Sequence, residues 1–274
     1  MQDQKVVVIT GASSGIGLAA AEQAAARGSQ VVLTGRTERR LTAAVDRVRA
    51  AGHGREPGRF LADFERLAEV RKLAEHLLDT YPRIDVLVNN AGMHVPSHRL
   101  TEDGNEATVQ ANHLGHFLLS TLLRDRLRGG RIINTSVRPA PNARIDPDHL
   151  NTPAERYHSV PVYQMTKAAN VLFAMEAARR WPDILSLSFH PGLVRTNIGE
   201  GTAFAYVFRY APFLISPQRS AAGLTPLITG PAAGLRNGGL YAGGRPLRLR
   251  QTIFNPDVAA RVWSASEDAV RQPG

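Results

Sequence analysis

The sequence of 274 residues predicts an α/β fold, with one parallel sheet covered by helices on both faces. Apolar, β-branched segments alternate along the chain with segments of helical periodicity, which is the pattern of a parallel sheet. A glycine-rich turn joins the first apolar segment directly to the first helical one. No stretch has the composition of a linker, so we expect residues 1–274 to form a single doubly wound domain with about seven strands.

The first strand and the first helix are the most clearly marked elements. Residues 6–9 form an unbroken run of β-branched side chains, typical of a strand that is buried on both faces. Three glycines then lead into the apolar periodicity of residues 18–27, which predicts a helix. The alternation continues to the middle of the chain, with strands expected at 29–34, 59–64 and 84–92 and helices ending near residues 51 and 81.

The second half of the chain continues this alternation with longer connections. Helical periodicity runs from about 105 to 127, and a strand is expected at 130–136. A stretch rich in proline and arginine then extends to about 161 without a regular pattern. The remaining expected elements are helices at 162–181, 217–228 and 257–270 and strands at 184–190 and 239–241.

The composition argues against several classes of function. The chain has no cysteine, which excludes disulfides, thiolate metal sites and a cysteine nucleophile. Its nine histidines show no ligand spacing with carboxylates, so we expect no catalytic metal. The net charge is +9, but the arginines are scattered and no basic run alternates with aromatic residues, so we expect no nucleic-acid partner.

The start of the chain bears on its location. The first strand begins about five residues in, which leaves no room for a secretory signal, and no apolar stretch is long enough to cross a membrane. We therefore expect a cytoplasmic protein and do not expect membrane contact.

The turn after the first strand has the features of a phosphate cradle. It reads Thr10-Gly11-x-x-x-Gly15-x-Gly17 between a predicted strand and a predicted helix. Glycine permits a tight turn and lets backbone N–H groups approach a pyrophosphate, and the helix N-terminus favours anionic oxygens. The glycines alone also fit an ordinary strand-to-helix turn, so the prediction of a dinucleotide site depends on further motifs.

The end of the second strand bears on the choice of nucleotide. In dinucleotide-binding folds an acidic residue at this place pairs with the ribose hydroxyls of NAD, and here the chain has Gly35 and Arg36 instead. Arg39 and Arg40 follow closely. Guanidinium groups can bind a 2′-phosphate, so the sequence favours NADPH over NAD, the alternative being a solvated arginine cluster.

Taken together, the motifs resemble those of the short-chain dehydrogenase/reductase family in order and spacing. They span the chain and are Thr10-Gly11-x-x-x-Gly15-x-Gly17, Asp63, Asn89-Asn90-Ala91-Gly92, Asn112, Tyr163-x-x-x-Lys167 and Pro191-Gly192. Segments 112–117 and 190–192 and the tail, with Arg261-Val262-Trp263 and Ser266-Glu267, look like the retinol-dehydrogenase-like carbonyl reductases of that family. The resemblance implies a Rossmann-type fold and an oxidoreductase that uses a nicotinamide cofactor.

The resemblance also implies roles for individual residues. Tyr163 would be the general acid-base residue, Lys167 its electrostatic partner and Asn112 a relay residue. The implied cofactor-binding positions are Gly11, Ser13, Ser14, Gly15, Ile16 and Gly17 at the pyrophosphate, Arg36 at the 2′-phosphate, Asp63 and Phe64 at the adenine, Asn90, Ala91 and Gly92 near the ribose, and Pro191, Gly192, Val194 and Thr196 at the nicotinamide, together with Tyr163 and Lys167.

Carbonyl reduction requires side chains of these types. Hydride transfer to a carbonyl carbon develops negative charge on the oxygen, and a nearby phenol must deliver a proton to it. A free tyrosine has a pKa of about 10. We therefore expect the ammonium of Lys167, one helical turn from Tyr163, to lower the pKa of the phenol. Such pairs also arise by chance on amphipathic helices, and it is the accompanying motifs that favour the catalytic interpretation.

The fifth strand departs from the family pattern. The catalytic serine of the family is commonly the second of two adjacent serines, and the alignment places Ser136 at the first and Val137 at the second. Neighbouring strand residues point to opposite faces, so Ser136 can orient a substrate only if the strand twists or bulges there. Alternatively, Tyr163 acts without a serine, or a group from the irregular stretch replaces it. The candidates there are Arg138, Asn142, Tyr157, His158 and Ser159.

Residues 204–215 bear on the substrate. This segment is aromatic and nearly uncharged, and it lies in the region 197–216, where the family carries a substrate lid. Its composition suggests a bulky hydrophobic or polycyclic ketone or aldehyde as the substrate. The same rings could instead pack into the core or touch a membrane surface.

The sequence therefore predicts an NADPH-dependent reductase of a bulky carbonyl compound, with Tyr163 as proton donor. One alternative is the reverse reaction, oxidation of the alcohol. Another is an NADP(H)-binding protein with a regulatory or other non-redox role, in which the change at Val137 has removed the chemistry. Because members of the family often pair through the helices that hold Asn112 and Tyr163, a homodimer or homotetramer is a further expectation.

Overall fold

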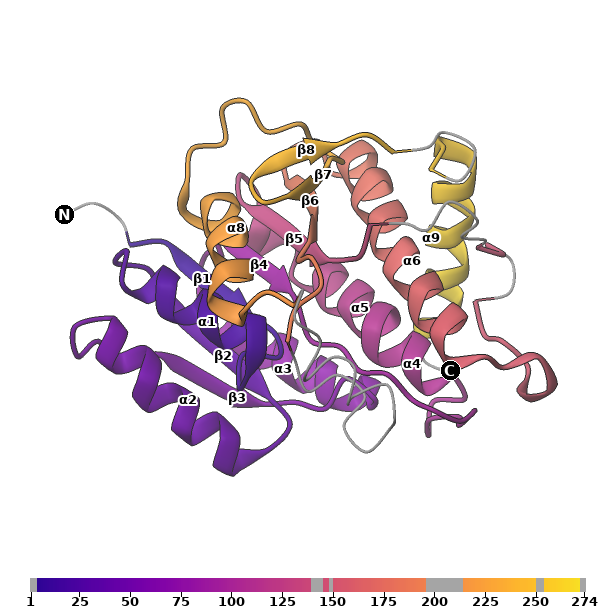
Figure 1. The fold of residues 1–274 in the computed structure, drawn as a ribbon, viewed down its shortest axis with the longest axis horizontal. Coiled ribbons are helices and arrows are strands. Elements are labelled where there is room, and N and C mark those ends of the chain that lie inside the picture. The colour runs from indigo at the N-terminus through magenta and orange to yellow at the C-terminus, as the bar shows by residue number, and fades with distance from the viewer. Residues whose placement is uncertain (1–3, 139–144, 148–149, 196–213, 250–253, 272–274) are drawn as a thin grey trace.

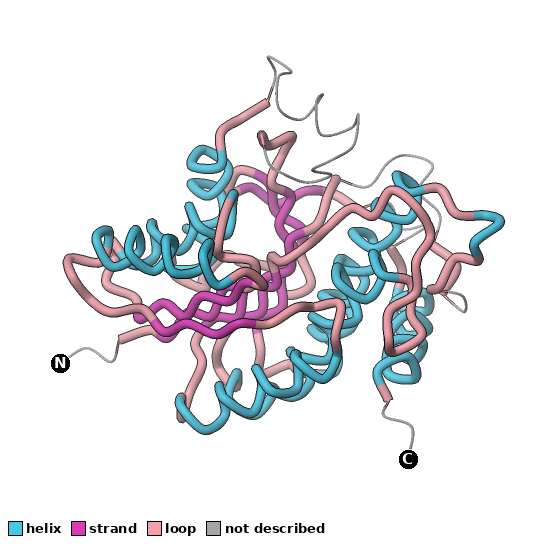
Figure 2. The backbone as a smooth tube through the Cα atoms, turned by 90° about the horizontal axis from the view of Figure 1, so that it is seen from below, coloured by secondary structure: helices cyan, strands magenta, loops and turns pink. Residues whose placement is uncertain are grey.

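The protein is built around an eight-stranded sheet with helices on both faces (Figures 1 and 2). The computed structural model describes residues 4–138, 145–147, 150–195, 214–249 and 254–271. The strand order is β3-β2-β1-β4-β5-β6-β7-β8, and every neighbouring pair is parallel except β7 and β8. The strands are β1 (Val6–Ile9), β2 (Gln30–Gly35), β3 (Gly58–Leu61), β4 (Val86–Asn89), β5 (Arg131–Thr135), β6 (Leu185–His190), β7 (Leu240–Ala242) and β8 (Arg245–Leu247).

The helices form one layer on each face of the sheet, as Figure 2 shows. One face is covered by α1 (Gly15–Ala25), α2 (Glu38–Ala51) and α8 (Pro217–Thr229). The other face is covered by α3 (Leu67–Thr80), α5 (Gly115–Leu122) and α6 (Ser159–Arg180), with α9 (Pro256–Val270) outside α6. Alternate residues of β1 enter the two layers, because Val7 joins the first and Val8 the second.

Helix α9 lies alongside α6 on its outer side (Figure 1). The ring of Trp263 stacks on Phe173 with centroids 5.6 Å apart, and it meets Phe117 of α5 edge-on at 4.9 Å. Because the sheet covers the inner side of α6 and α9 the outer side, every residue from Thr166 to Ala174 is buried. This explains why α6 shows little of the amphipathic pattern of a surface helix.

The doubly wound α/β fold predicted from the sequence is confirmed, with two differences. An eighth strand, β8, pairs antiparallel with β7, and its three residues are too few to show a pattern in the sequence. The helix expected at 105–127 is interrupted: α4 (Ala107–Val109) leads into a π-helical turn, η1 (Gln110–Leu114), before α5, and a 3₁₀ turn, η2 (Arg124–Leu127), follows. A short 3₁₀ turn, η3 (Ala154–Arg156), precedes α6.

Candidate functional site

A cavity of about 540 Å³ opens at the carboxyl ends of the parallel strands. In open α/β sheets this edge, at the point where the strand order reverses, is where ligands bind. Most of the predicted site residues line it, although they come from segments spread over the chain. The predicted residues that line the cavity are Gly11, Ser13, Ser14, Gly15, Ile16, Arg36, Asp63, Phe64, Asn90, Ala91, Gly92, Ser136, Tyr163, Lys167 and Pro191.

The turn between β1 and α1 leaves room for a phosphate group. Gly11 has φ +64°, and a Cβ atom there would lie 2.7 Å from Cα of Ala91. Gly17 does not line the cavity, but a Cβ there would lie 2.5 Å from the carbonyl oxygen of Gly11 and would push the turn outwards. Ser14 caps α1 without a side-chain hydrogen bond, so the first N–H groups of the helix are available to an anion. This cradle fits a pyrophosphate.

Thr10 ties the glycine turn to the end of β4. Its hydroxyl oxygen accepts hydrogen bonds from the backbone N–H groups of Asn90 and Ala91, both at 2.9 Å. The amide of Asn90 in turn donates to the carbonyl oxygen of Thr10 at 3.0 Å. The two segments that would bracket a nucleotide are therefore held at a fixed distance.

Two arginines line the end of the cavity beyond β2. Arg36 and Arg40 stand there with Asp63 and Phe64, and the Arg36 guanidinium lies 3.7 Å from a carboxylate oxygen of Glu65. The other oxygen of Glu65 accepts from Arg99, which offsets its negative charge. This end of the cavity therefore combines cationic groups with an aromatic ring, and such a surface fits a phosphorylated nucleoside.

Tyr163 and Lys167 project from the same face of α6 into the cavity. The ammonium nitrogen of Lys167 lies 5.6 Å from the centre of the Tyr163 ring. A Cβ atom on Gly92 would lie 3.1 Å from that nitrogen, so the backbone at Gly92 lies close against the end of the lysine side chain. The predicted catalytic pair is thus in contact with the loop that follows β4.

Burial changes the acidity of both groups. It raises the pKa of Tyr163 to about 12 and lowers the pKa of Lys167 to about 8. The expected lowering of the tyrosine pKa by the lysine is therefore wrong for this site, because burial disfavours the phenolate and shifts the pKa upwards. At neutral pH the phenol is protonated and the lysine charged, the state that a proton donor needs.

Asn112 lies behind the cavity in the π-helical turn η1 and does not line it. Its side-chain oxygen accepts from the backbone N–H of Met93 at 2.7 Å, and its amide donates to the carbonyl oxygen of Met93 at 2.9 Å and to the Thr166 hydroxyl at 3.2 Å. Asn112 therefore fixes the loop after Gly92 against α6. π-helical turns of this kind occur frequently at functional sites.

The hydroxyl of Ser136 is engaged by the backbone of α6. It donates to the carbonyl oxygen of Lys167 at 2.6 Å, and Ser136 is almost fully buried. Val137 follows, half-buried. Of the alternatives in the irregular stretch, Tyr157 donates to the carbonyl oxygen of Val95 at 2.7 Å. Four of those alternatives are described and do not line the cavity, namely Arg138, Tyr157, His158 and Ser159; Asn142 lies outside the described residues.

The nicotinamide side of the predicted site is only partly described. Pro191 lines the cavity, Gly192 has φ +81°, and Val194 is buried and pairs with Ile215. Thr196 and nearly all of the expected lid at 197–216 lie outside the described residues.

The structure also adds residues that the motifs did not single out. His94 lies beside Tyr163, with ring centroids 6.0 Å apart and the rings edge-on, and burial lowers its pKa. Its position two residues after the Asn-Asn-Ala-Gly segment is the signal that could have found it. The other added lining residues are Gly35, Thr37, Arg40, Ala62, Met93, Ala111, Thr135, Arg195 and Pro217, of which Gly35 and Arg40 had entered the argument on the nucleotide.

Comparison with known proteins identifies the family. A profile described as short chain dehydrogenase matches residues 5–146, the half of the chain that carries the glycine turn and the Asn-Asn-Ala-Gly segment. The chain belongs to the short-chain dehydrogenase/reductase family. It is therefore an oxidoreductase with a site for a nicotinamide cofactor.

Curated relatives in this family match nearly the whole chain. DnrU of Streptomyces sp. (strain C5), whose name gives it as a daunorubicin C-13 ketoreductase, is 48% identical over 266 residues, which cover 97% of this chain and 92% of DnrU. Human retinol dehydrogenase 13 is 32% identical over 275 residues, covering 96% of this chain and 83% of the relative. Both agree with the resemblance to retinol-dehydrogenase-like carbonyl reductases.

Solved structures share the fold. An uncharacterised protein from Mycobacterium paratuberculosis superposes with a TM-score of 0.78 at 30% identity, covering 97% of this chain and 93% of that one. A short chain dehydrogenase from Burkholderia cenocepacia J2315 in complex with NADP superposes with a TM-score of 0.69 at 27% identity, covering 87% and 95%.

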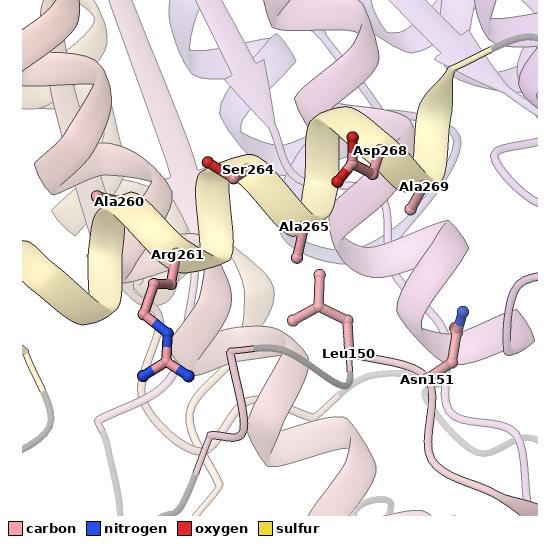
Figure 3. A pocket seen from close by; sticks show the side chains of 8 residues that line it. All are labelled: Leu150, Asn151, Ala260, Arg261, Ser264, Ala265, Asp268 and Ala269. Carbon is pink, nitrogen blue, oxygen red and sulfur yellow. The ribbon is translucent and has the colours of Figure 1, made fainter.

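A second hollow, of about 630 Å³, lies between α9 and residues 150–151, and few of its side chains are reactive (Figure 3). Its ionisable side chains are Arg261 and Asp268, and most of the others are small or apolar. It contains none of the motif residues at the strand ends. Among the described residues, no group of histidine and carboxylate side chains could hold a metal ion, and no helix is long and apolar enough to span a membrane.

Proposed function

We propose that the protein is an NADPH-dependent ketoreductase that reduces the carbonyl group of a bulky, polycyclic substrate to the alcohol. The observation that carries this proposal is that Tyr163 and Lys167 line the same cavity as the glycine turn and the two arginines, Arg36 and Arg40. A proton donor and a dinucleotide cradle thus share one space. The arginines, and the lack of a carboxylate at the end of β2, favour NADPH over NADH.

In this reaction the bound cofactor supplies the hydride. Tyr163, a phenol at neutral pH, donates its proton to the carbonyl oxygen as negative charge develops there. The Lys167 ammonium, 5.6 Å from the ring centre, stabilises that charge and the phenolate left behind. Asn112 holds the backbone of Met93, in the loop after Gly92 that borders Tyr163 and Lys167.

Tyr163 acts in this proposal without a serine donor. The engagement of Ser136 with the carbonyl oxygen of Lys167 and the apolar side chain of Val137 support that choice among the three explanations. A missing donor typically lowers the rate by about 10² to 10³. A rigid polycyclic ketone offsets part of this loss, because its own shape restricts how the carbonyl can lie.

The substrate class rests on the likeness to DnrU and on the segment 204–215. The name of DnrU refers to the C-13 ketone of daunorubicin, a carbonyl beside a polycyclic ring system. The aromatic composition of residues 204–215 suits such a substrate. The alcohol-oxidising direction uses the same residues, and a high ratio of NADPH to NADP favours reduction.

The experiment begins with fluorescence titrations of the protein with NADPH and NADH. Loss of nicotinamide absorbance is then followed with polycyclic and aryl ketones, daunorubicin and retinal. We expect tighter binding of NADPH, turnover of a polycyclic ketone, and a Tyr163→Phe variant whose kcat is lower by about 10² to 10⁴ with NADPH binding retained. Tight NADPH binding without turnover of any ketone, or of any alcohol with NADP, would instead support the redox-inactive alternative.

A further inference from the structure

The backbone carbonyl of Asn112 is the point where two chains of buried side chains meet. Its oxygen accepts from the amide of Asn170 on α6 at 3.0 Å and from Nδ1 of His116 on α5 at 3.2 Å. All three residues are at most 2% exposed. The carbonyl belongs to the π-helical turn η1, where the widened backbone departs from the regular helical hydrogen-bond pattern.

The first chain runs outwards from Asn170. The amide nitrogen of Asn170 also donates to the carbonyl oxygen of Thr135 at 3.2 Å. Both N–H groups of this amide therefore face carbonyl oxygens, which can only accept, so the amide oxygen must be the acceptor from Nδ1 of His113 at 3.0 Å. Asn170 thus connects the end of β5, the turn η1 and α6.

His113 extends this chain to the C-terminal helix. Its Nε2 lies 2.8 Å from the hydroxyl of Ser266 on α9, 153 positions later in the sequence. Burial lowers the pKa of His113 to about 4, so the ring is neutral at neutral pH. With Nδ1 carrying the proton, Nε2 can only accept, so Nε2 shares the single hydroxyl proton of Ser266 with the carbonyl oxygen of Val262, to which Ser266 donates at 2.7 Å.

The second chain starts at the nucleotide cradle. The Thr10 hydroxyl lies 3.0 Å from Nε2 of His116, whose Nδ1 must donate to the Asn112 carbonyl oxygen. The two chains therefore point their donors at one acceptor, the Asn112 carbonyl oxygen. Within each chain the hydrogen bonds run from donor to acceptor in one direction, and bonds aligned in this way polarise one another in a low-dielectric interior.

We propose that Asn170, His113 and Ser266 are positioning residues that set the turn of Asn112, and through Asn112 the Met93 segment, against Tyr163 and Lys167. On this account α9 is part of the support of the reaction site, although no residue of α9 lines the cavity. The inference rests on the proposed ketoreductase function for its kinetic consequence only. Its structural consequence, the placement of Met93, does not depend on that function.

The sequence motifs acquire a common explanation from this arrangement. The segment 112–117 and the tail with Ser266 are among the features that resembled retinol-dehydrogenase-like reductases, and apart from Asn112 their residues had no role in binding the cofactor or in proton donation. In the structure they are joined by the contact between His113 and Ser266 and by the edge-on packing of Phe117 on Trp263.

The test compares Ser266→Ala and Asn170→Ala with Val262→Ala, a buried residue on the same face of α9 whose side chain is outside the hydrogen-bond chain. Melting temperature, NADPH affinity, kcat and KM are measured for each. We expect Asn170→Ala to lower kcat about 10- to 100-fold and Ser266→Ala about threefold, with NADPH affinity unchanged within about twofold. Val262→Ala should lower the melting temperature and leave kcat within about twofold.

A second readout does not need activity. The Met93 N–H donates to the Asn112 side chain, so its hydrogen exchange reports the position of the turn. We expect faster exchange of Met93 in Ser266→Ala than in Val262→Ala. The same exchange rate of Met93 in Ser266→Ala and Val262→Ala would overturn the proposal. The proposal would also be overturned if two variants that lose the same melting temperature lose the same kcat. If Asn170→Ala does not fold, the Ser266→Ala comparison decides. Absence of turnover in the wild type would contradict the ketoreductase function, and the exchange comparison would still decide this inference.

Discussion

The two ends of the cavity are built by different means. At the phosphate end the parts come from two short continuous segments, the turn from Gly11 to Gly17 and residues 89–92. Most of the groups that shape this end belong to the backbone. At the catalytic end, Tyr163 and Lys167 line the cavity, and the side chains behind it that support them are far apart in the sequence, such as His113 and Ser266, 153 positions apart.

This difference shows which part of a site can be recognised from a motif in the sequence. Backbone groups need glycine or a small residue at fixed spacing, because a Cβ would collide with a neighbouring segment, and such spacing is visible in the sequence. A series of buried side chains linked by hydrogen bonds needs only one polar residue in each of several elements. Each of those residues, taken alone, is an ordinary polar residue of a core.

The largest effect should follow from breaking the catalytic end at Lys167. We expect Lys167→Met to lower kcat about 10² to 10³ through loss of the charge beside Tyr163. Because burial lowers the pKa of Lys167 to about 8, the wild-type rate of reduction should be level near neutral pH and fall as the pH rises through about 8. pH profiles of kcat and kcat/KM for the wild type and Lys167→Met measure both the loss of rate and its dependence on pH. A variant with wild-type kcat, or with the same fall in rate at alkaline pH, would contradict this role.

A change at Gly17 should break the phosphate end. A Cβ atom there would meet the Gly11 carbonyl oxygen at 2.5 Å and the Asn90 amide at 2.6 Å. Such overpacking costs about 1–3 kcal/mol, or roughly 5- to 150-fold in the NADPH dissociation constant of Gly17→Ala. The matched control is Gly223→Ala in α8, outside the cavity lining, where the closest contact of the added Cβ is 3.1 Å. Equal NADPH affinity of the two variants would show that the turn does not hold the phosphates.

A smaller effect should sharpen the assignment of the nucleotide. Arg36 lines the cavity with a side chain that is 59% exposed, so solvent screens its attraction for a phosphate. We expect Arg36→Ala to reduce the preference for NADPH over NADH about tenfold and to leave NADH binding unchanged. Arg39→Ala is the control, since Arg39 is exposed and lies outside the cavity lining. If Arg36→Ala keeps the same preference for NADPH over NADH, the arginines are a solvated cluster that does not select the nucleotide.

The effect that is smallest at neutral pH, where it is absent, concerns folding at the catalytic end. Burial lowers the pKa of His113 to about 4 and that of His116 to about 3, whereas both titrate near 6.5 in the unfolded chain. Below about 6.5 the unfolded state binds protons that the folded state does not. The free energy of unfolding should therefore fall with decreasing pH by about 1.4 kcal/mol per pH unit for each histidine. Urea unfolding between about pH 4.5 and 7.5 measures this slope, and a stability that does not change there would contradict it.

The fold could be predicted because its signals are local. The alternation of apolar strands and periodic helices gave the order of the elements, and the family motifs gave most of the cavity lining. The strand β8 was missed because three residues, one of them a proline, carry no alternation. The turn η1 was missed because a single widened turn does not change the apolar periodicity around it.

The acidity of Tyr163 shows a limit of another kind. The spacing of Tyr163 and Lys167 correctly placed both on one face of α6, and from that spacing a lowered tyrosine pKa follows. Burial reverses the direction, and burial depends on elements remote from the motif, such as the loop after β4, where His94 lies against Tyr163. The residue types of a site can be read from a motif, but its electrostatics follow from what covers it.

The packing of α9 across α6 also concerns how the protein associates with itself. Pairing through the helices that hold Asn112 and Tyr163 requires an open surface on them, yet in this chain residues 166–174 of α6 are buried beneath α9. A second copy could use that surface only by displacing α9, and with it Trp263 and Ser266. The chain thus covers this surface of α6 with its own helix. We therefore expect light scattering to give the mass of a single chain.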